Sequence, residues 1–424
     1  MSFMCRNISG LQLIAALWLS AGFAWVCGVE ASELTLEKAE DLALASDPEV
    51  RAVQANKLAL EEESVAAGQL PDPMLKLGLV NLPTDTFNLG QEPMTQVQVG
   101  VIQKFPRGKS RSLRSEQTYL KSEVLDEVAR DKELQIRLAV REQFLEVLKQ
   151  QELARINAAA IAAFSDVAEI TREYYATGRV PQQDVLQASV ELARMEDRAV
   201  RIEQDEEQAR TRLSTWIGDA AYGDLAAGWP RFLVSYGSDV IIGNLPEHPR
   251  IQAIQKNMSA ADTGVELARQ RYKPEFALDL SYGGRGGMNP DGTARSDLLS
   301  FMVLMDVPLF TKNRQDRMVA AQEAESAAVT FMRDDVLRRM RSEVEFNSKT
   351  YDRQVERIEL FENKLLPEAA FSSDASLEAY QSSIEDLTTV LRTRITEFDL
   401  QLEHARLQAE VLKTQARLQY LEGV

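Results

Sequence analysis

The sequence predicts a mainly α-helical protein with a small β part, built from long antiparallel helical hairpins and four short strands. Three observations carry this prediction. Two stretches of about 70 residues have the texture of continuous helix, four short segments alternate apolar and polar residues, and an internal duplication gives each half one strand pair and one hairpin.

The composition argues against several classes of protein. The chain has 424 residues and a formal net charge of -17, and phosphate binding needs a basic surface, so we expect no nucleic-acid binder. His248 and His404 are the only histidines, and Cys5 and Cys27 are the only cysteines, which leaves little material for a metal centre or an acid–base site. The sequence therefore predicts no enzyme, no cofactor and no resident metal.

The first 31 residues have the pattern of a signal peptide. Arg6 supplies the positive charge, residues 11–26 form an apolar stretch, and Val29-Glu30-Ala31 fits a small-residue cleavage site. We expect cleavage after Ala31 and an oxidising envelope compartment. Two alternatives stay open. Cys27 could be a lipidated N-terminus, although no small residue precedes it, and the stretch could be a retained anchor, although it is shorter than the ~20 residues that span a bilayer.

A long internal repeat organises the rest of the chain. DPEVRAVQAN, starting at Asp47, matches HPRIQAIQKN, starting at His248, with an offset of 201. The offset becomes 205 where Tyr175 aligns with Tyr380. The predicted division is a signal peptide (1–31), a first structural repeat (32–218), a linker or equatorial segment (219–243) and a second structural repeat (244–424).

Each repeat contains one pair of alternating segments. We expect strands at Met74–Leu82 and Met94–Phe105 in the first repeat, and at Glu275–Tyr282 and Ser300–Leu309 in the second. Segments of about 9 to 11 residues with one apolar face have the size of tilted transmembrane barrel strands. An ordinary soluble hairpin is the alternative.

A helical hairpin follows each strand pair. Residues 110–177 and 313–380 contain one proline, Pro367, and a continuous helix of this length would approach about 100 Å. Second helices over 181–216 and 385–421 must return antiparallel to the first. Because about eight strands is the smallest membrane barrel, four strands require several copies of the chain. Three copies would supply twelve strands and a tube of helices.

The duplication, the strand pairs and the long hairpins together indicate a family resemblance. Five segments add to it: QLPDPMLKLGLVNLP, QKFPRGKSR, MDVPLFTKNR, YATGRVPQQDVLQA and YQSSIEDLTTVL. Over essentially the whole mature chain, the sequence resembles the outer-membrane factor family, the TolC-like exit ducts of tripartite efflux and secretion systems. NLP after the first strand and LFTKNR after the fourth resemble the branch that serves heavy-metal RND efflux pumps.

The resemblance implies a homotrimer with a twelve-strand β-barrel in the outer-membrane lipid and a helical tunnel in the periplasm. It implies two partners, a periplasmic adaptor (membrane fusion) protein and an inner-membrane RND pump. The expected function is passive export of substrate, with heavy-metal cations expected first. Drug efflux, type I protein secretion and a structural coiled-coil envelope protein without a pore are the alternatives.

The tips of the two hairpins are the candidate functional region. The resemblance implies that they close the duct and dock the adaptor, although Ser383 stands where related ducts carry glycine. The predicted gate residues are Asp184, Tyr380, Glu385 and Asp386, and the predicted docking residues are Gly178, Arg179, Val180, Pro181, Ser383 and Ile384. Rings of acidic residues favour cations. In the alternative interpretation, Gly178 and Pro181 only shape a turn, and the acids are only solvated helix-start charges.

Two further residue types have structural interpretations. His248 precedes Pro249 as Asp47 precedes Pro48, so we expect it to cap a helix and not to bind metal. Met302 and Met305 fall on opposite faces of a strand, so they cannot share one thioether site.

Overall fold

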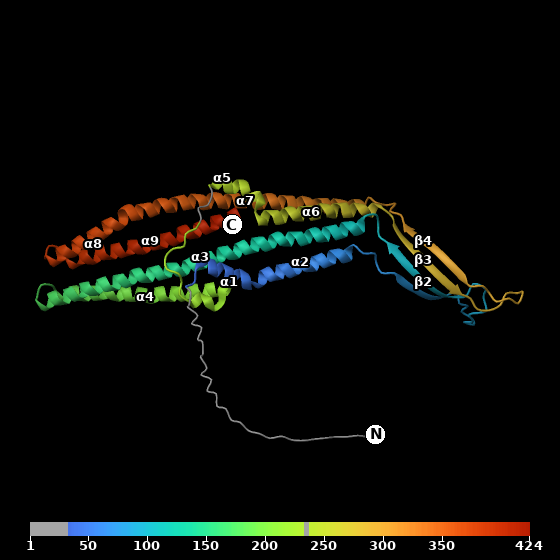
Figure 1. Ribbon diagram of the computed structural model, residues 1–424, viewed down its shortest axis with the longest axis horizontal. Helices are drawn as coiled ribbons and strands as arrows, with labels where there is room; N and C mark the ends of the chain where they lie inside the picture. The colour runs from blue at the N-terminus through green and yellow to red at the C-terminus, as the bar shows by residue number, and fades with distance from the viewer. Residues whose placement is uncertain (1–32, 233–236) are drawn as a thin grey trace, which may run out of the picture.

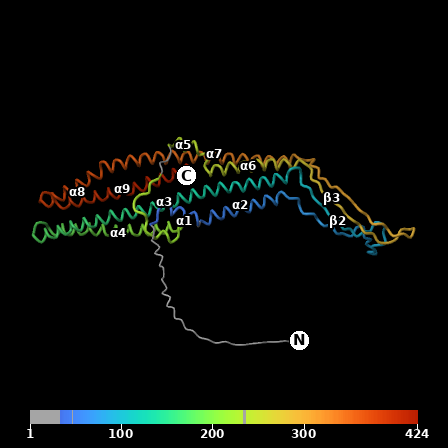
Figure 2. The backbone as a smooth tube through the Cα atoms, in the orientation of Figure 1, coloured from blue at the N-terminus to red at the C-terminus, as the bar shows by residue number. Residues whose placement is uncertain are grey.

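The computed structural model describes residues 33–232 and 237–424, so the predicted signal peptide and both cysteines lie outside the described residues. The molecule is elongated, with the strands at one end and two helical tips at the other (Figure 1). The long helices run side by side along most of its length (Figure 2).

The β part is one antiparallel sheet in the order β1-β2-β3-β4. Its strands are β1 (Met74–Val80), β2 (Gln96–Phe105), β3 (Glu275–Gly284) and β4 (Leu298–Asp306). Both halves of the chain therefore contribute two strands to the same sheet. β1 and β4 are its edges, and each pairs with one strand only within the described residues.

The two faces of the sheet differ in polarity. Leu77, Val99, Tyr282 and Leu299 lie in one row across the four strands, and all four are exposed. The adjacent row, on the opposite face, contains Lys76, Gly100, Ser281 and Ser300. The alternation predicted from the sequence is thus confirmed as one exposed apolar face and one polar face.

An ion pair on the polar face connects β1 with β3. Lys76 Nζ on β1 lies 2.8 Å from Asp279 Oδ2 on β3, so the lysine reaches across the intervening strand β2. Lys76 is paired directly with Gly100, where an added Cβ would lie only 2.6 Å from the Cβ of Ser281. A side chain at position 100 of β2 would therefore clash with β3, so this position requires glycine.

The register also separates the two methionines of β4. Met302 is opposite Asp279, and Met305 is opposite Phe276, which belongs to the other face. The prediction that they point to opposite faces is confirmed.

Long helices make up the rest of the molecule. In the first half these are α1 (Leu36–Ser46), α2 (Pro48–Ala67), α3 (Ser110–Ala176) and α4 (Gln182–Ile217). In the second half they are α5 (Ser238–Asn244), α6 (Pro249–Arg269), α7 (Gln315–Leu360), α8 (Leu366–Gln381) and α9 (Leu387–Glu422). Short 3₁₀ turns occur at η1 (Gly218–Tyr222), η2 (Leu245–Glu247) and η3 (Gln270–Tyr272). No described helix combines the length and the apolar character needed to cross a membrane.

The starts of α2 and α6 use equivalent caps. Asp47 Oδ1 accepts hydrogen bonds from the backbone N–H groups of Glu49 and Val50, at 2.8 and 3.0 Å. His248 Nδ1 accepts one from the N–H of Arg250 at 3.2 Å. The predicted capping role of His248 is therefore confirmed.

The second long helix departs from the prediction of one continuous α-helix. α3 is uninterrupted over 67 residues, whereas α7 and α8 are joined by a π-helical turn, η4 (Phe361–Leu365). Pro367 follows the turn at the second position of α8. Proline has no N–H and its ring crowds the preceding turn, and a π-turn accommodates both effects.

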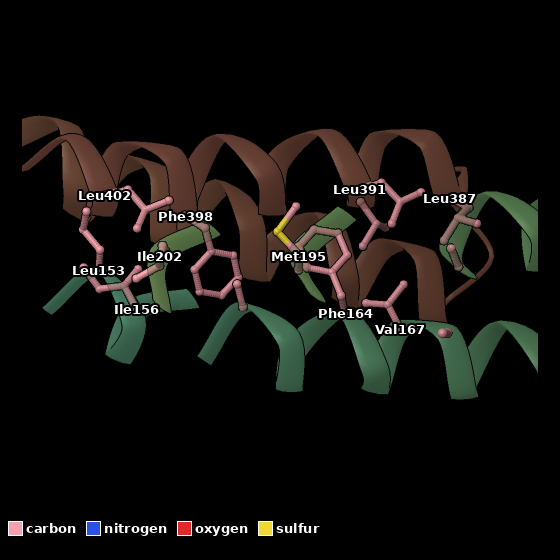
Figure 3. Close-up of a cluster of buried hydrophobic side chains, with 14 of the residues drawn as sticks. Leu153, Ile156, Phe164, Val167, Met195, Ile202, Leu387, Leu391, Phe398 and Leu402 are labelled. Atoms are coloured by element: carbon pink, nitrogen blue, oxygen red, sulfur yellow. The ribbon is translucent and has the colours of Figure 1, made fainter. Parts of the chain in front are cut away.

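The largest apolar cluster joins the two hairpins. Leu153 and Phe164 from α3, Met195 from α4, and Leu391 and Phe398 from α9 meet in it (Figure 3). All five are less than 7% exposed. The cluster aligns both tips at the same end of the molecule.

Candidate functional site: the paired hairpin tips

Both tips are built on the same turn. In the first, Arg179 N–H donates to Tyr174 O at 2.8 Å and Gly178 N–H to Tyr175 O at 2.9 Å. In the second, Ile384 N–H donates to Ala379 O and Ser383 N–H to Tyr380 O, both at 2.9 Å. This pattern is the Schellman motif of helix ends, and it recurs at the 205-residue offset.

The residue after each turn starts the returning helix in a different way. Pro181 precedes α4 and makes no side-chain cap, whereas Asp386, its equivalent, accepts a hydrogen bond from Thr389 N–H at 2.8 Å. Asp386 is therefore an N-cap residue, as the helix-start interpretation expects. α9 begins at Leu387, two residues later than predicted.

An aromatic contact joins the two tips. The rings of Tyr174 from α3 and Tyr380 from α8 lie 5.7 Å apart, and Tyr174 Oη donates to Gln381 O at 3.4 Å. The guanidinium of Arg179 lies 5.2 Å from the Tyr174 ring centroid, within the range of a cation–π interaction. Tyr174 was not predicted as a site residue, and its only sequence signal is the tandem Tyr174-Tyr175.

Tyr380 is buried between the hairpins. Its side chain is 4% exposed, and its hydroxyl has no hydrogen-bond partner among the described residues. Burial raises the pKa of the Tyr380 hydroxyl, against a smaller opposing effect of the Thr171 side chain, and the charge of Asp184 adds to the rise.

The structure brings two of the three predicted acids together. Burial raises the pKa of Asp184, and the negative charge of Asp386 adds to the effect. The backbone hydrogen bond from Thr389 lowers the pKa of Asp386, with a smaller contribution from Arg392. Glu385 is exposed, and no ion pair or side-chain hydrogen bond of the described residues involves its carboxylate.

The predicted docking residues are mostly accessible at the tips. Gly178, Arg179, Pro181 and Ser383 are exposed, and Ile384 is 79% exposed although it is a large apolar residue. Val180 is different, because it packs against the cluster between the hairpins. Within residues 33–232 and 237–424, no group of three or more His, Cys, Asp or Glu side chains could hold a metal ion.

Sequence comparison identifies similar proteins. Residues 244–424 match the family described as "Outer membrane efflux protein". The chain is 22% identical over 291 residues to the pyoverdine export outer membrane protein OpmQ of Pseudomonas putida, covering 65% of this chain and 58% of that protein. It is 24% identical over 312 residues to the cobalt-zinc-cadmium resistance protein CzcC of Cupriavidus metallidurans, covering 70% of this chain and 68% of that one.

Solved structures share the fold. The outer-membrane channel OprN has a TM-score of 0.75 at 14% identity, covering 92% of this chain and 89% of its own. CusC has a TM-score of 0.75 at 13% identity, with 92% of each chain covered. VceC of Vibrio cholerae has a TM-score of 0.76 at 16% identity, covering 92% and 96%. These identities are low, so the similarity establishes the fold, which agrees with the predicted fold class.

Proposed function

We propose that the chain belongs to the outer membrane efflux protein family, whose model matches residues 244–424, and that it is the outer-membrane exit channel of a tripartite efflux system. Members of this family are channels and not enzymes, and they lie in the outer membrane with a helical extension in the periplasm. The observation that carries the proposal is a sheet with an exposed apolar face, joined to described helices none of which is long and apolar enough to cross a membrane.

The sheet supports insertion as part of a larger barrel. The two edge strands leave a row of backbone groups unpaired within the described residues, and such groups cost several kcal/mol each in lipid. Pairing β4 of one copy with β1 of the next removes both edges. A structural coiled coil without a pore has no use for this sheet, so we rank that alternative below the channel.

The first hairpin supports association with further copies. On its free flank, Tyr175, Leu186 and Val200 are 47%, 59% and 65% exposed. Their equivalents at the 205-residue offset, Tyr380, Leu391 and Ala405, are at most 4% exposed, because the first hairpin packs against them. A neighbouring second hairpin would bury the free flank in the same way. We infer a homotrimer, since three copies supply twelve strands.

The tips are the proposed gate and docking surface. Asp184, Tyr380, Glu385 and Asp386 form the gate in this proposal, and three copies place nine carboxylates around the passage. The exposed turn residues Gly178, Arg179, Pro181, Ser383 and Ile384, with Val180 behind them, dock a periplasmic adaptor protein, which connects the channel to an inner-membrane RND pump. Ile384 offers an apolar contact and Arg179 a charged one.

Heavy-metal cations are the substrate we propose first. Support comes from the similarity to a cobalt-zinc-cadmium resistance protein and from the acidic residues at the tips. The similarity to a pyoverdine exporter favours an organic substrate instead, as drug efflux or type I secretion would. Zinc and cadmium tolerance of a strain lacking this chain, with and without its reintroduction, discriminates between these substrates.

The channel proposal is tested on purified protein. Light scattering should give the mass of a trimer in detergent, and planar bilayers should show conductance that favours cations. The variant Asp184→Asn/Glu385→Gln/Asp386→Asn should lose part of that preference. The matched control is Glu203→Gln/Asp205→Asn/Glu207→Gln, which removes three exposed acids from the middle of α4. A stable, water-soluble monomer would contradict the barrel, and an unchanged preference would contradict the gate.

The division of the chain remains a prediction. The signal peptide (1–31), the two repeats (32–218 and 244–424) and the segment between them (219–243) are proposed from the sequence. Mass spectrometry of the mature N-terminus decides between cleavage after Ala31 and a lipidated Cys27.

A further inference from the structure

A cavity of about 700 Å³ lies where the strands give way to the helices. It is bordered by the end of β2 and start of α3, by the end of α6 with η3, and by the start of α7. In Figure 1 these segments meet at the sheet end of the helices, far from the tips. The cavity is therefore separate from the proposed gate.

Arginine dominates the lining of this cavity. Arg107, Arg114, Arg271, Arg314 and Arg317 line it, and Glu275 is the single carboxylate among the lining residues. A second carboxylate, that of Asp306, pairs with Arg107 from outside the lining. This local excess of positive charge contrasts with the formal net charge of -17 of the whole chain. It marks an anion-attracting surface.

Four of these guanidinium groups are uncommitted. Arg107 is tied to Asp306, to Glu275 at 3.5 Å and to Arg271 O at 3.0 Å. Within the described part of the chain, no ion pair or side-chain hydrogen bond involves the guanidinium groups of the other four arginines, Arg114, Arg271, Arg314 and Arg317. The planar guanidinium group of arginine can donate two parallel hydrogen bonds to two oxygens of one phosphate. These four groups can therefore bind an anion without breaking existing contacts.

Two buried polar groups also line the cavity without partners. Ser110 and Gln315 are the first residues of α3 and α7, and they are equivalent at the 205-residue offset. They are 5% and 8% exposed, and Ser110 Oγ and Gln315 Oε1 have no hydrogen-bond partner among the described residues. Neither helix start is capped by a side chain. Two long helices thus direct the positive ends of their dipoles toward the same site.

The surroundings point to the source of the anion. Leu309 and Phe310, just before α7, are 74% and 81% exposed, and they continue the exposed apolar band of β4. An apolar surface beside a cluster of arginines fits a lipid, whose acyl chains and phosphate lie side by side at a membrane interface.

We propose that this cavity binds a phosphate-bearing anion, and that its source is the headgroup of an anionic phospholipid. Arg114 and Arg317 hold the phosphate oxygens, and the starts of α3 and α7 complete the site. The lipid as the source rests on the proposed outer-membrane function. The phosphate site itself rests on the cavity alone.

The test uses the full chain purified in a neutral detergent. Native mass spectrometry measures binding of phosphatidylglycerol against phosphatidylcholine, and calorimetry measures binding of inorganic phosphate. We expect phosphatidylglycerol to bind in preference to phosphatidylcholine, and Arg114→Gln/Arg317→Gln to weaken it about tenfold. Arg172→Gln/Arg212→Gln, which removes two exposed arginines from the helices away from the junction, should leave binding unchanged.

The remaining outcomes are also informative. Saturable phosphate binding that the cavity variant weakens, without a preference for phosphatidylglycerol, supports the anion site with a soluble source. The proposal is overturned if the protein binds neither phosphatidylglycerol nor inorganic phosphate. It is also overturned if both double variants weaken binding equally. If the glutamine variant does not fold, Arg114→Lys/Arg317→Lys keeps the charges and removes the planar forks, and several-fold weaker binding is expected. Conductance and trimer mass are measured on the same samples, so failure of the channel proposal is seen separately.

Discussion

Gly178 and Ser383 occupy equivalent positions in the two tip turns, and both have a left-handed backbone, with φ of 72° and 58°. Glycine adopts this conformation without steric cost, whereas a residue with a Cβ pays roughly 1–2 kcal/mol. The second tip therefore holds strain that the first tip avoids.

Ser383→Gly should stabilise the second tip by about 1 kcal/mol, because it removes the Cβ from a left-handed residue. Hydrogen exchange of the amides of residues 380–386 measures the change. Ser383→Ala is the control, since alanine retains the Cβ and should give no such protection. Unchanged exchange in the glycine variant would show that the turn is unstrained.

Lys76→Gln should destabilise the sheet by about 1–3 kcal/mol, because it leaves the buried carboxylate of Asp279 without its charged partner. The temperature at which the protein unfolds in SDS is the measurement. Lys76→Gln/Asp279→Asn should recover part of the loss, and Lys104→Gln, an exposed lysine of the same sheet, should have little effect. A double variant no better than the single one would contradict the pairing.

Stability should fall as the pH drops below about 6.5, and His248 should contribute to this loss. Its Nδ1 accepts from Arg250 N–H, so Nε2 carries the proton and donates to Tyr420 O at 2.9 Å. Burial lowers the pKa of His248, against smaller opposing effects of the Tyr420 carbonyl and of Asp131, so the unfolded chain binds a proton more readily than the folded one.

The thermal midpoint between pH 5 and pH 8 tests this prediction. His248→Asn keeps a capping side chain and removes the titrating group, so its midpoint should depend less on pH. Parallel profiles of the two proteins would exclude His248 as the source.

Asp184→Asn should stabilise the tips at pH 7. Burial and the charge of Asp386 raise the pKa of Asp184, so the ionised carboxylate is disfavoured in the folded state. This penalty is present at neutral pH and disappears as the pH falls below the ordinary carboxyl range, so the advantage of the amide should vanish near pH 4. Thermal midpoints at both pH values measure it. Glu385→Gln, at an exposed acid of the same tip, should show no such gain.

The sequence predicted the elements well because their signals are local. Alternation located all four strands, and the pattern around Pro48 and Pro249 marked two helix starts. The first start was expected within one helical stretch over 34–70, which the structure divides into α1 and α2 at Asp47. The π-turn at 361–365 was missed. Pro367 signals a disturbance, but a turn with one extra residue leaves almost no trace in the apolar pattern.

The site was predicted less completely because its contacts are not local. The duplication aligned Tyr380 with Tyr175, yet one is buried and the other exposed. That difference arises from packing between two hairpins about 200 residues apart in sequence. The same separation in sequence explains why Tyr174 was not predicted as the partner of Tyr380. The positions of Ser110 and Gln315 in one cavity likewise appear only in the folded chain.

The π-turn η4 gives the helix that leads to the second tip a point at which it can bend. From η4 to the tip, α8 spans 16 residues, which is about 24 Å of helix. A bend of about 10° at such a joint would carry the tip sideways by about 4 Å, whereas α3 has no comparable joint along its 67 residues. Phe361 is buried at this joint and stacks on His404 of α9, with 6.0 Å between the ring centroids. The helical part of the chain therefore combines α3, which is straight and resists bending, with α7 and α8, whose junction concentrates bending at one aromatic pair.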